Sequence, residues 1–145
     1  MPSAPVMTLD DLLCFDLYAA SRAVTARYRP LLDPLGLTYP QYLVMVVLWE
    51  GSPVTMRELG DRLHLDSGTL SPLVRRLQDD GLVAKRRRPE DERSVEISLT
   101  AEGRALRRRA VKVPQQMGEA MGLDADGLDA LRTVLQQLTE NVTAT

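Results

Sequence analysis

The most reactive side chain in this chain of 145 residues is the thiol of Cys14, its only cysteine. Cys14 lies one helical turn before Tyr18 in a segment of helical character. Because a thiolate is a strong nucleophile, Cys14 is a candidate redox centre. A lone cysteine also serves in many proteins as a small apolar filler without chemistry, and the sequence leaves both interpretations open.

The composition does not indicate a metal site, a disulfide within the chain or a membrane span. One cysteine and one histidine, His64, do not supply the four ligands of a structural zinc site, so we predict no metal and no cofactor. No apolar run approaches the roughly 20 residues that a membrane span needs, and residues 1–7 lack the features of a secretory signal. We therefore predict a cytoplasmic protein without membrane contact.

Positive charge is concentrated in one third of the chain, although the net charge is −2. Residues 75–109 contain eleven Lys/Arg and seven Asp/Glu, an excess of +4, and the remainder contains seven and thirteen, a net of −6. A local basic excess of this kind is typical of a surface that contacts phosphates. A solvated, salt-bridged surface is the alternative.

Two helices are expected in the first third of the chain. Apolar residues at helical spacing predict a first helix from Thr8 to Arg29, ended by Pro30. A second helix begins near Pro40, is apolar on all sides and ends at 51–53. Its composition predicts that it is buried.

The next two elements have the pattern of a helix-turn-helix. A capping box at Thr55 opens a short helix, and a second short helix ends at Gly81. Pro72 leaves the start of the second helix open: it begins either at Ser67 with a distorted first turn or later, with Ser71 as its cap.

A basic hairpin and two further helices follow. Strands are expected at 82–88 and 94–99 around a turn at 89–92, and Thr100 caps a long helix that Pro114 kinks. The predicted inward positions of that helix are 106, 110, 113, 117 and 121. The last helix has an apolar seam at Leu128, Leu131, Leu135, Leu138 and Val142, which covers its own core or pairs with a second copy.

These elements place polar and basic side chains where a nucleic-acid reader needs them. One helix fits the major groove, and an arginine-rich hairpin tip fits a minor groove. The use of such a fold for protein contact is the alternative. The candidate DNA-binding residues are Ser67, Gly68, Thr69, Ser71, Arg75, Arg76, Arg86, Arg87, Arg88 and Arg93.

Four motifs resemble one protein family. Residues 91–103 are similar to the wing signature of the MarR family of winged-helix repressors. Residues 14–22 resemble the sensing helix of its organic-hydroperoxide-sensing branch, the OhrR type, and residues 65–73 resemble the recognition-helix start of that branch. Residues 37–42 match this branch as well. The similarity extends over roughly residues 8–140.

The resemblance implies a mainly α fold with a small β-hairpin wing, in which the N- and C-terminal helices form a dimerisation domain. The helical dimerisation region would comprise 8–50 and 100–145, and the winged helix-turn-helix DNA-binding region 53–99. The protein would then be an obligate homodimer on a double-stranded DNA operator, with Asp91 supporting the wing.

The resemblance also implies a mechanism. An organic hydroperoxide oxidises Cys14, which Tyr28 and Tyr39 of the other subunit contact, and the repressor releases its operator. Cys14 would lie beyond the first helical turn, so its activation falls to groups that folding brings near. Some members of this branch have a second cysteine, which this chain lacks. Reversal would therefore need a low-molecular-weight thiol.

Two other hypotheses remain. In one, the same repressor is released by a small phenolic or other ligand between the dimerisation and DNA-binding regions, and Cys14 is structural. In the other, the chain is a thiol peroxidase. The chain has no second, resolving cysteine and no histidine or arginine beside Cys14 in the sequence, so we predict that it is not an enzyme.

Overall fold

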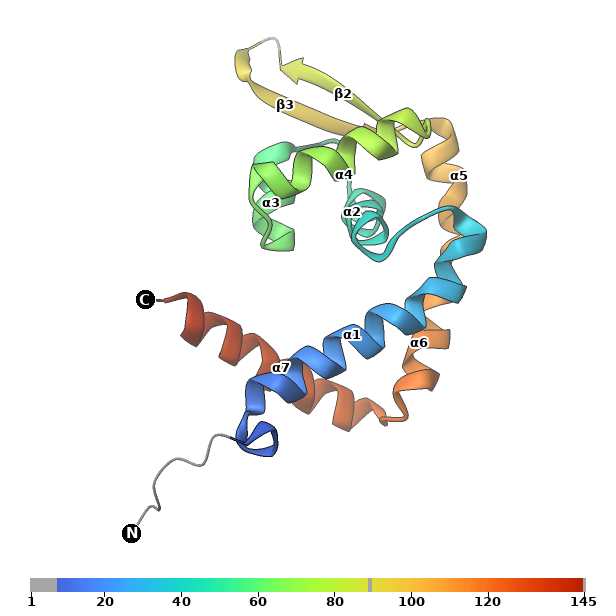
Figure 1. Cartoon of the computed structure of the whole chain (residues 1–145). Coiled ribbons are helices and arrows are strands. Elements are labelled where there is room, and N and C mark those ends of the chain that lie inside the picture. Colours follow the sequence, from blue (N-terminus) through green and yellow to red (C-terminus); the bar gives the residue numbers. More distant parts are fainter. Residues whose placement is uncertain (1–7, 89, 145) are drawn as a thin grey trace. The chain divides into compact units, whose positions relative to one another are not determined.

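The computed structural model describes residues 8–88 and 90–144, and the side chains of 91–93 lie outside this description. The chain divides into two compact units between Val111 and Lys112. The elements are mainly helical, with one small antiparallel sheet (Figure 1), which confirms the predicted fold class. The predicted dimerisation and DNA-binding regions are defined by function, whereas the two units are defined by compactness. The division into these regions therefore stays a prediction.

Most elements belong to the first unit. In chain order they are η1 (Leu9–Asp11), α1 (Leu13–Leu32), η2 (Asp33–Leu35), α2 (Tyr39–Glu50), β1 (Val54–Thr55), α3 (Met56–Leu63), α4 (Ser67–Asp79), β2 (Val83–Arg88), β3 (Asp91–Leu99) and α5 (Ala101–Ala110). The second unit contains α6 (Val113–Met121) and α7 (Ala125–Thr143).

Helix α2 forms the centre of the first unit, as its apolar composition predicts. Val44, Met45 and Leu48 are fully buried, and α2 packs against α1, α3, α4 and α5. A capping box fixes its start: Thr38 Oγ1 accepts a hydrogen bond from the Gln41 amide, and the Gln41 side chain accepts one from the Thr38 amide.

Both predicted ends of the first helix are wrong. A short 3-10 turn occupies Leu9–Asp11, and α1 begins at Leu13 instead of Thr8. At the other end Pro30 lies inside the helix. A proline there removes one backbone bond, and the burial of Leu32 in the last turn favours continuation of the helix past it.

The predicted helix-turn-helix is confirmed in α3 and α4. Thr55 and Glu58 form both hydrogen bonds of the capping box that opens α3. Helix α4 begins at Ser67, which decides between the two starts that Pro72 left open. It ends at Asp79. Gly81 follows two residues later with φ +77°, a left-handed conformation that favours glycine.

The wing is the outer part of a three-stranded sheet in the order β1-β3-β2. Val83 pairs with Leu99 and Arg87 with Val95 in an antiparallel register, as the alternating pattern predicts. Strand β3 begins at Asp91 and not at Ser94. Strand β1 was not predicted, because two residues are too few to form a pattern. Pro89, which the sequence places in the turn, lies outside the described residues.

The helix predicted after Thr100 consists of two helices. The chain leaves α5 at Val111, and Pro114 lies in the first turn of α6 instead of kinking a continuous helix. Four of the five predicted inward positions are buried: Leu106, Ala110, Val113 and Met117. The prediction for Met121 is wrong: it is 41% exposed, because α6 ends there and Gly122 follows in a left-handed conformation.

The predicted seam of α7 is largely exposed in the single chain. No residue of α7 is buried, and Leu131 and Val142 are 46% and 66% exposed. Across the described residues, no single helix is long and apolar enough to cross a membrane. One bent pair, Leu13–Leu35 with Tyr39–Glu50, meets that test by length and composition only, and α2 is a mostly buried core helix.

Candidate DNA-binding surface and redox centre

Helix α4 presents one apolar face inward and the predicted reading residues outward. Leu70, Val74 and Leu77 are buried in the first unit. The predicted contacts on the other side are exposed, except for the half-buried Ser71: Ser67, Gly68, Thr69, Arg75 and Arg76. The amphipathic pattern of α4 therefore directs the predicted DNA-binding residues toward solvent.

The start of α4 is fixed by Asp66. Its Oδ1 accepts a hydrogen bond from the Thr69 amide at 2.7 Å. The backbone hydrogen bond from Thr69 holds the pKa of the Asp66 carboxyl below its ordinary value, with smaller contributions from the Thr69 side chain and the Gly68 amide. Asp66 therefore orders the first turn, where Ser67 and Gly68 face solvent.

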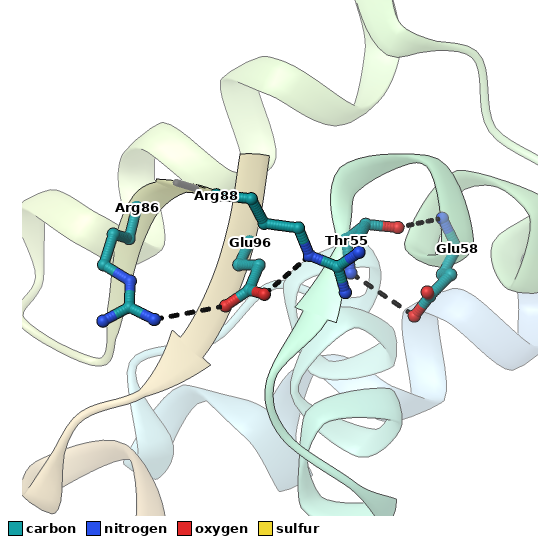
Figure 2. Close-up of polar contacts among 5 residues, drawn as sticks. All are labelled: Thr55, Glu58, Arg86, Arg88 and Glu96. Carbon is teal, nitrogen blue, oxygen red and sulfur yellow. Dashed lines mark hydrogen bonds and ion pairs between the residues drawn. The ribbon is translucent and has the colours of Figure 1, made fainter. Parts of the chain in front are cut away.

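The wing arginines do not form a uniform basic surface. Arg86 and Arg88 both face Glu96 on the neighbouring strand β3 (Figure 2). Arg88 Nε donates to Glu96 Oε1 at 2.7 Å, whereas Arg86 Nη2 lies 3.8 Å from Glu96 Oε2. Arg87 is exposed and pairs in register with Val95. The side chains of Asp91 and Arg93, both predicted wing residues, lie outside the described residues.

Cys14 is exposed and is the second residue of α1. The sequence interpretation placed it beyond the first turn, and this is wrong because the helix begins at Leu13. Three large apolar neighbours are exposed as well: Leu13 at 65%, Phe15 at 39% and Tyr18 at 57%. In the single chain, Cys14 is therefore not a buried apolar filler.

Tyr28 and Tyr39 are in direct contact. Their rings are stacked with centroids 4.4 Å apart, and Tyr42 lies 5.7 Å from Tyr28. Burial raises the pKa of Tyr28 to about 12, with smaller contributions from Tyr39 and Tyr42. Burial also raises the pKa of Tyr39. Both hydroxyls therefore stay protonated at neutral pH and are able to donate hydrogen bonds.

Cys14 and Tyr28 cannot meet within one chain. Both lie on α1, fourteen residues apart, which corresponds to about 21 Å along a helix and about 40° around its axis. They share a face but are separated by nearly four turns. Contact between this thiol and these tyrosines requires a second copy of the chain.

The other two tyrosines, Tyr18 and Tyr42, differ in burial. Tyr42 is 6% exposed, packs on Tyr28 and approaches Trp49 edge-on at 6.4 Å, so it serves in packing. Tyr18 is exposed in the single chain, and its ring lies 5.5 Å from the Arg22 guanidinium. Its exposure does not support packing within one chain.

Sequence reasoning missed Glu96. Glu96 is an acidic residue on the central strand directly opposite Arg86, and its side chain is only 16% exposed. An acidic residue among apolar residues in a strand opposite an arginine run was the available signal.

Comparisons with known proteins agree with this geometry. The family described as "Transcriptional regulator SarA/Rot" matches residues 26–109. A curated relative, the organic hydroperoxide resistance transcriptional regulator of Bacillus subtilis, is 45% identical over 94% of this chain and 92% of its own length. The chain belongs to the MarR family of winged-helix transcriptional regulators.

Two solved structures share this fold. Reduced AbfR bound to DNA matches with a TM-score of 0.78 and 32% identity, over 93% of this chain and 94% of that one; AbfR comes from Staphylococcus epidermidis. A mutant MarR from E. coli in complex with operator DNA has a TM-score of 0.81 over 93% of this chain and 99% of that one. At 24% identity, this second likeness concerns the fold alone. These MarR-family relatives are regulators and not enzymes.

Proposed function

We propose that this MarR-family regulator is a homodimeric repressor that senses organic hydroperoxides through Cys14 and releases operator DNA when Cys14 is oxidised. The 45% identical relative is an organic hydroperoxide resistance regulator. AbfR, 32% identical, has been crystallised reduced and overoxidised on DNA and in a disulfide form. Both relatives support a redox signal.

The observation that carries the proposal is the position of Cys14 relative to the tyrosines. The thiol is exposed at the start of α1, whereas the stacked pair of Tyr28 and Tyr39 lies about 21 Å further along. Two α1 helices that cross antiparallel near residue 21 would bring each Cys14 opposite the partner's Tyr28. The sensing site is thus shared between two copies.

The exposed apolar residues favour such a dimer. Leu9 and Leu12, which precede α1, and Leu13, its first residue, are each about half exposed or more in the single chain. The seam of α7 is exposed in the same way. Clusters of exposed large apolar side chains on a helix are typical of an interface. We therefore assign 8–50 and 100–145 to dimerisation and 53–99 to DNA binding.

The chemistry is a two-electron oxidation of the thiol. The Cys14 thiolate attacks the terminal oxygen of the hydroperoxide, the O–O bond breaks, and the alkoxide leaves as an alcohol after taking up a proton. The sulfur becomes a sulfenic acid. The partner's Tyr28 and Tyr39 hydroxyls, protonated at neutral pH, donate hydrogen bonds to the thiolate and orient the peroxide. Oxidation disturbs those bonds.

The reading surface is α4 with the wing. The start of α4 enters a major groove, and the arginines neutralise phosphates, so log affinity falls with log salt by about 0.9 for each contact. Asp91 supports the wing tip that carries Arg93. The proposed contacts are Ser67, Gly68, Thr69, Ser71, Arg75, Arg76, Arg86, Arg87 and Arg93.

Reversal of the switch needs a partner. Because Cys14 is the only cysteine, its sulfenic acid has no second thiol in the same chain. A low-molecular-weight thiol then forms a mixed disulfide, and without it oxidation proceeds to sulfinic or sulfonic acid. A repressor acts where its DNA lies, which agrees with the predicted cytoplasmic location.

The test is fluorescence anisotropy of a labelled duplex from the gene's own upstream region. Wild type and Cys14→Ser are bound to it and treated with stoichiometric cumene hydroperoxide. We expect release of wild type and retention of the variant. Retention of both would contradict redox sensing and favour release by a bound ligand. Absence of binding before treatment would contradict the repressor assignment itself.

A further inference from the structure

Glu96 occupies a central place at the base of the wing. It lies on the middle strand of the sheet, in register with Thr55 on β1 and with Arg86 on β2. Its side chain is 16% exposed. One largely buried carboxylate thus serves two of the three consecutive wing arginines (Figure 2).

The two arginines are held differently. Arg88 Nε donates to Glu96 Oε1 at 2.7 Å, and its side chain is 42% exposed. Arg86 approaches the other carboxylate oxygen only to 3.8 Å and is 76% exposed. A phosphate can therefore recruit Arg86 with little change at Glu96. Recruitment of Arg88 would break a short, charge-assisted hydrogen bond and leave a largely buried carboxylate without its donor.

Arg88 also lies where the regular hairpin ends. Arg87 pairs with Val95, whereas Arg88 pairs with Asp91, so the register shifts between these two neighbours. An irregularity of this kind bends and twists a strand locally. The Arg88 side chain reaches back across it to Glu96, on the regular part of the ladder. It therefore connects the wing tip to the base of the sheet.

A second acidic residue acts on the same guanidinium. Glu58, which caps α3 together with Thr55, lies on the side of Arg88 away from Arg86 (Figure 2). The hydrogen bond to Glu96 raises the pKa of Arg88, and the negative charges of Glu96, Glu58 and Glu90 add to that effect. Glu96 therefore makes the main interaction with this guanidinium, and Glu58 adds a weaker favourable charge.

We propose that Arg88 is a positioning residue, which Glu96 holds so that it fixes the wing tip relative to the base of the sheet. It does not contact DNA itself. The inference rests on the proposed DNA binding and changes the role predicted for this residue from the sequence. Arg86, on the same strand and beside the same carboxylate, stays available to phosphate.

The test is a double-mutant cycle on operator affinity. Arg88→Gln, Glu96→Gln and the double variant are titrated with the upstream duplex that wild type binds, and each variant's active fraction and Tm are measured to exclude misfolding. We expect each single variant to weaken operator binding by about tenfold, the range of one ordinary contact. In the Glu96→Gln background, Arg88→Gln should change affinity by less than about twofold.

Arg86→Gln is the matched control, measured on a random-sequence duplex as a function of salt. If Arg86 contacts phosphate in both subunits, its loss lowers the salt slope by about 1.8, two contacts at about 0.9 each. Arg88→Gln should leave this slope unchanged, because no phosphate contact is lost.

The outcomes separate the inference from the proposed function. Additive effects of Arg88→Gln and Glu96→Gln, a reduced salt slope for Arg88→Gln, or unaltered operator binding by that variant would each overturn the positioning role. An unchanged slope for Arg86→Gln would remove Arg86 from the proposed contacts without affecting Arg88. Failure of wild type to bind the duplex would instead contradict the proposed function.

Discussion

Gly103 lies in the first turn of α5, where the wing joins the helical core. A Cβ at this position would lie far inside 3.0 Å of the Leu82 carbonyl oxygen and 3.2 Å from Leu99 Cδ2. The same carbonyl accepts a hydrogen bond from the Thr100 amide at 3.1 Å. The Gly103 carbonyl accepts another from Trp49 Nε1 at 2.9 Å. Gly103→Ala must therefore displace backbone on both sides of the junction.

The cost follows from these contacts. Overpacking against backbone costs about 1–3 kcal/mol, and disturbing the two hydrogen bonds adds about 1 kcal/mol for each. Replacement of a helical glycine by alanine stabilises the folded state by about 1 kcal/mol. The expected net loss is about 3 kcal/mol in the free energy of unfolding.

Urea unfolding followed by the fluorescence of Trp49, the only tryptophan, measures this loss at fixed protein concentration. Gly118→Ala is the matched control: it also lies in a helix, but its Cβ would meet no atom within 4 Å. It should stabilise the protein by about 0.5–1 kcal/mol. A Gly103→Ala variant within about 0.5 kcal/mol of wild type would refute the close approach of α5 to Leu82.

Two further predictions concern titrating groups. The pKa of Tyr28 is raised from 10.0 to about 12 in the folded chain, so the unfolded state ionises first and stability falls as pH rises from 10 towards 12. Tyr28→Phe should remove about 1 kcal/mol of that loss. This is about half of what two pKa units represent, because Tyr28 is only half-buried. Urea midpoints that depend on pH equally in wild type and Tyr28→Phe would argue against this. Asp66→Ala should lower Tm by a few degrees. The pKa of Asp66 is lowered, so the difference from wild type should shrink as pH falls below the ordinary value of 3.8; a difference that persists in acid would exclude the charged cap as its source.

Local signals were sufficient to predict much of the fold. The capping box at Thr55 and the glycine at 81 mark helix ends through interactions between near neighbours in the sequence. The alternation at 94–99 marks a strand with one buried face, and Ile97 is fully buried. Such features depend on a few adjacent residues, which is why the sequence alone reveals them.

The misses arise where packing decides between local alternatives. Pro30 favours a helix end, but the burial of Leu32 in the following turn outweighs one lost backbone bond. Similarly, the start of α1 at Leu13 follows the turn at Leu9–Asp11, for which the sequence has no strong marker. The position of Cys14 in the first turn was missed for the same reason.

The candidate site was predicted in type but not in arrangement. Residue types and spacing indicate which side chains of α4 face outward. They do not indicate that Arg88 lies against Glu96 while Arg86 stays exposed, since this depends on strand register and on the irregularity after Arg87. The separation of Cys14 from Tyr28 follows directly once both are known to lie on one helix.

In the proposed mechanism, Cys14 of one subunit and the tyrosines of the other form the sensing site. Mixed dimers test it most directly, with hydroperoxide-induced release of the upstream duplex as the readout. One mixed dimer combines a Cys14→Ser subunit with a Tyr28→Phe/Tyr39→Phe subunit. The other combines a wild-type subunit with a subunit that carries all three substitutions.

Both mixed dimers contain one cysteine and one intact tyrosine pair. In the first, they lie on different subunits and form one complete shared site, so we predict release. In the second, they lie on the same chain and about 21 Å apart along α1, so we predict retention on DNA. Release of the second dimer with retention of the first would contradict the account.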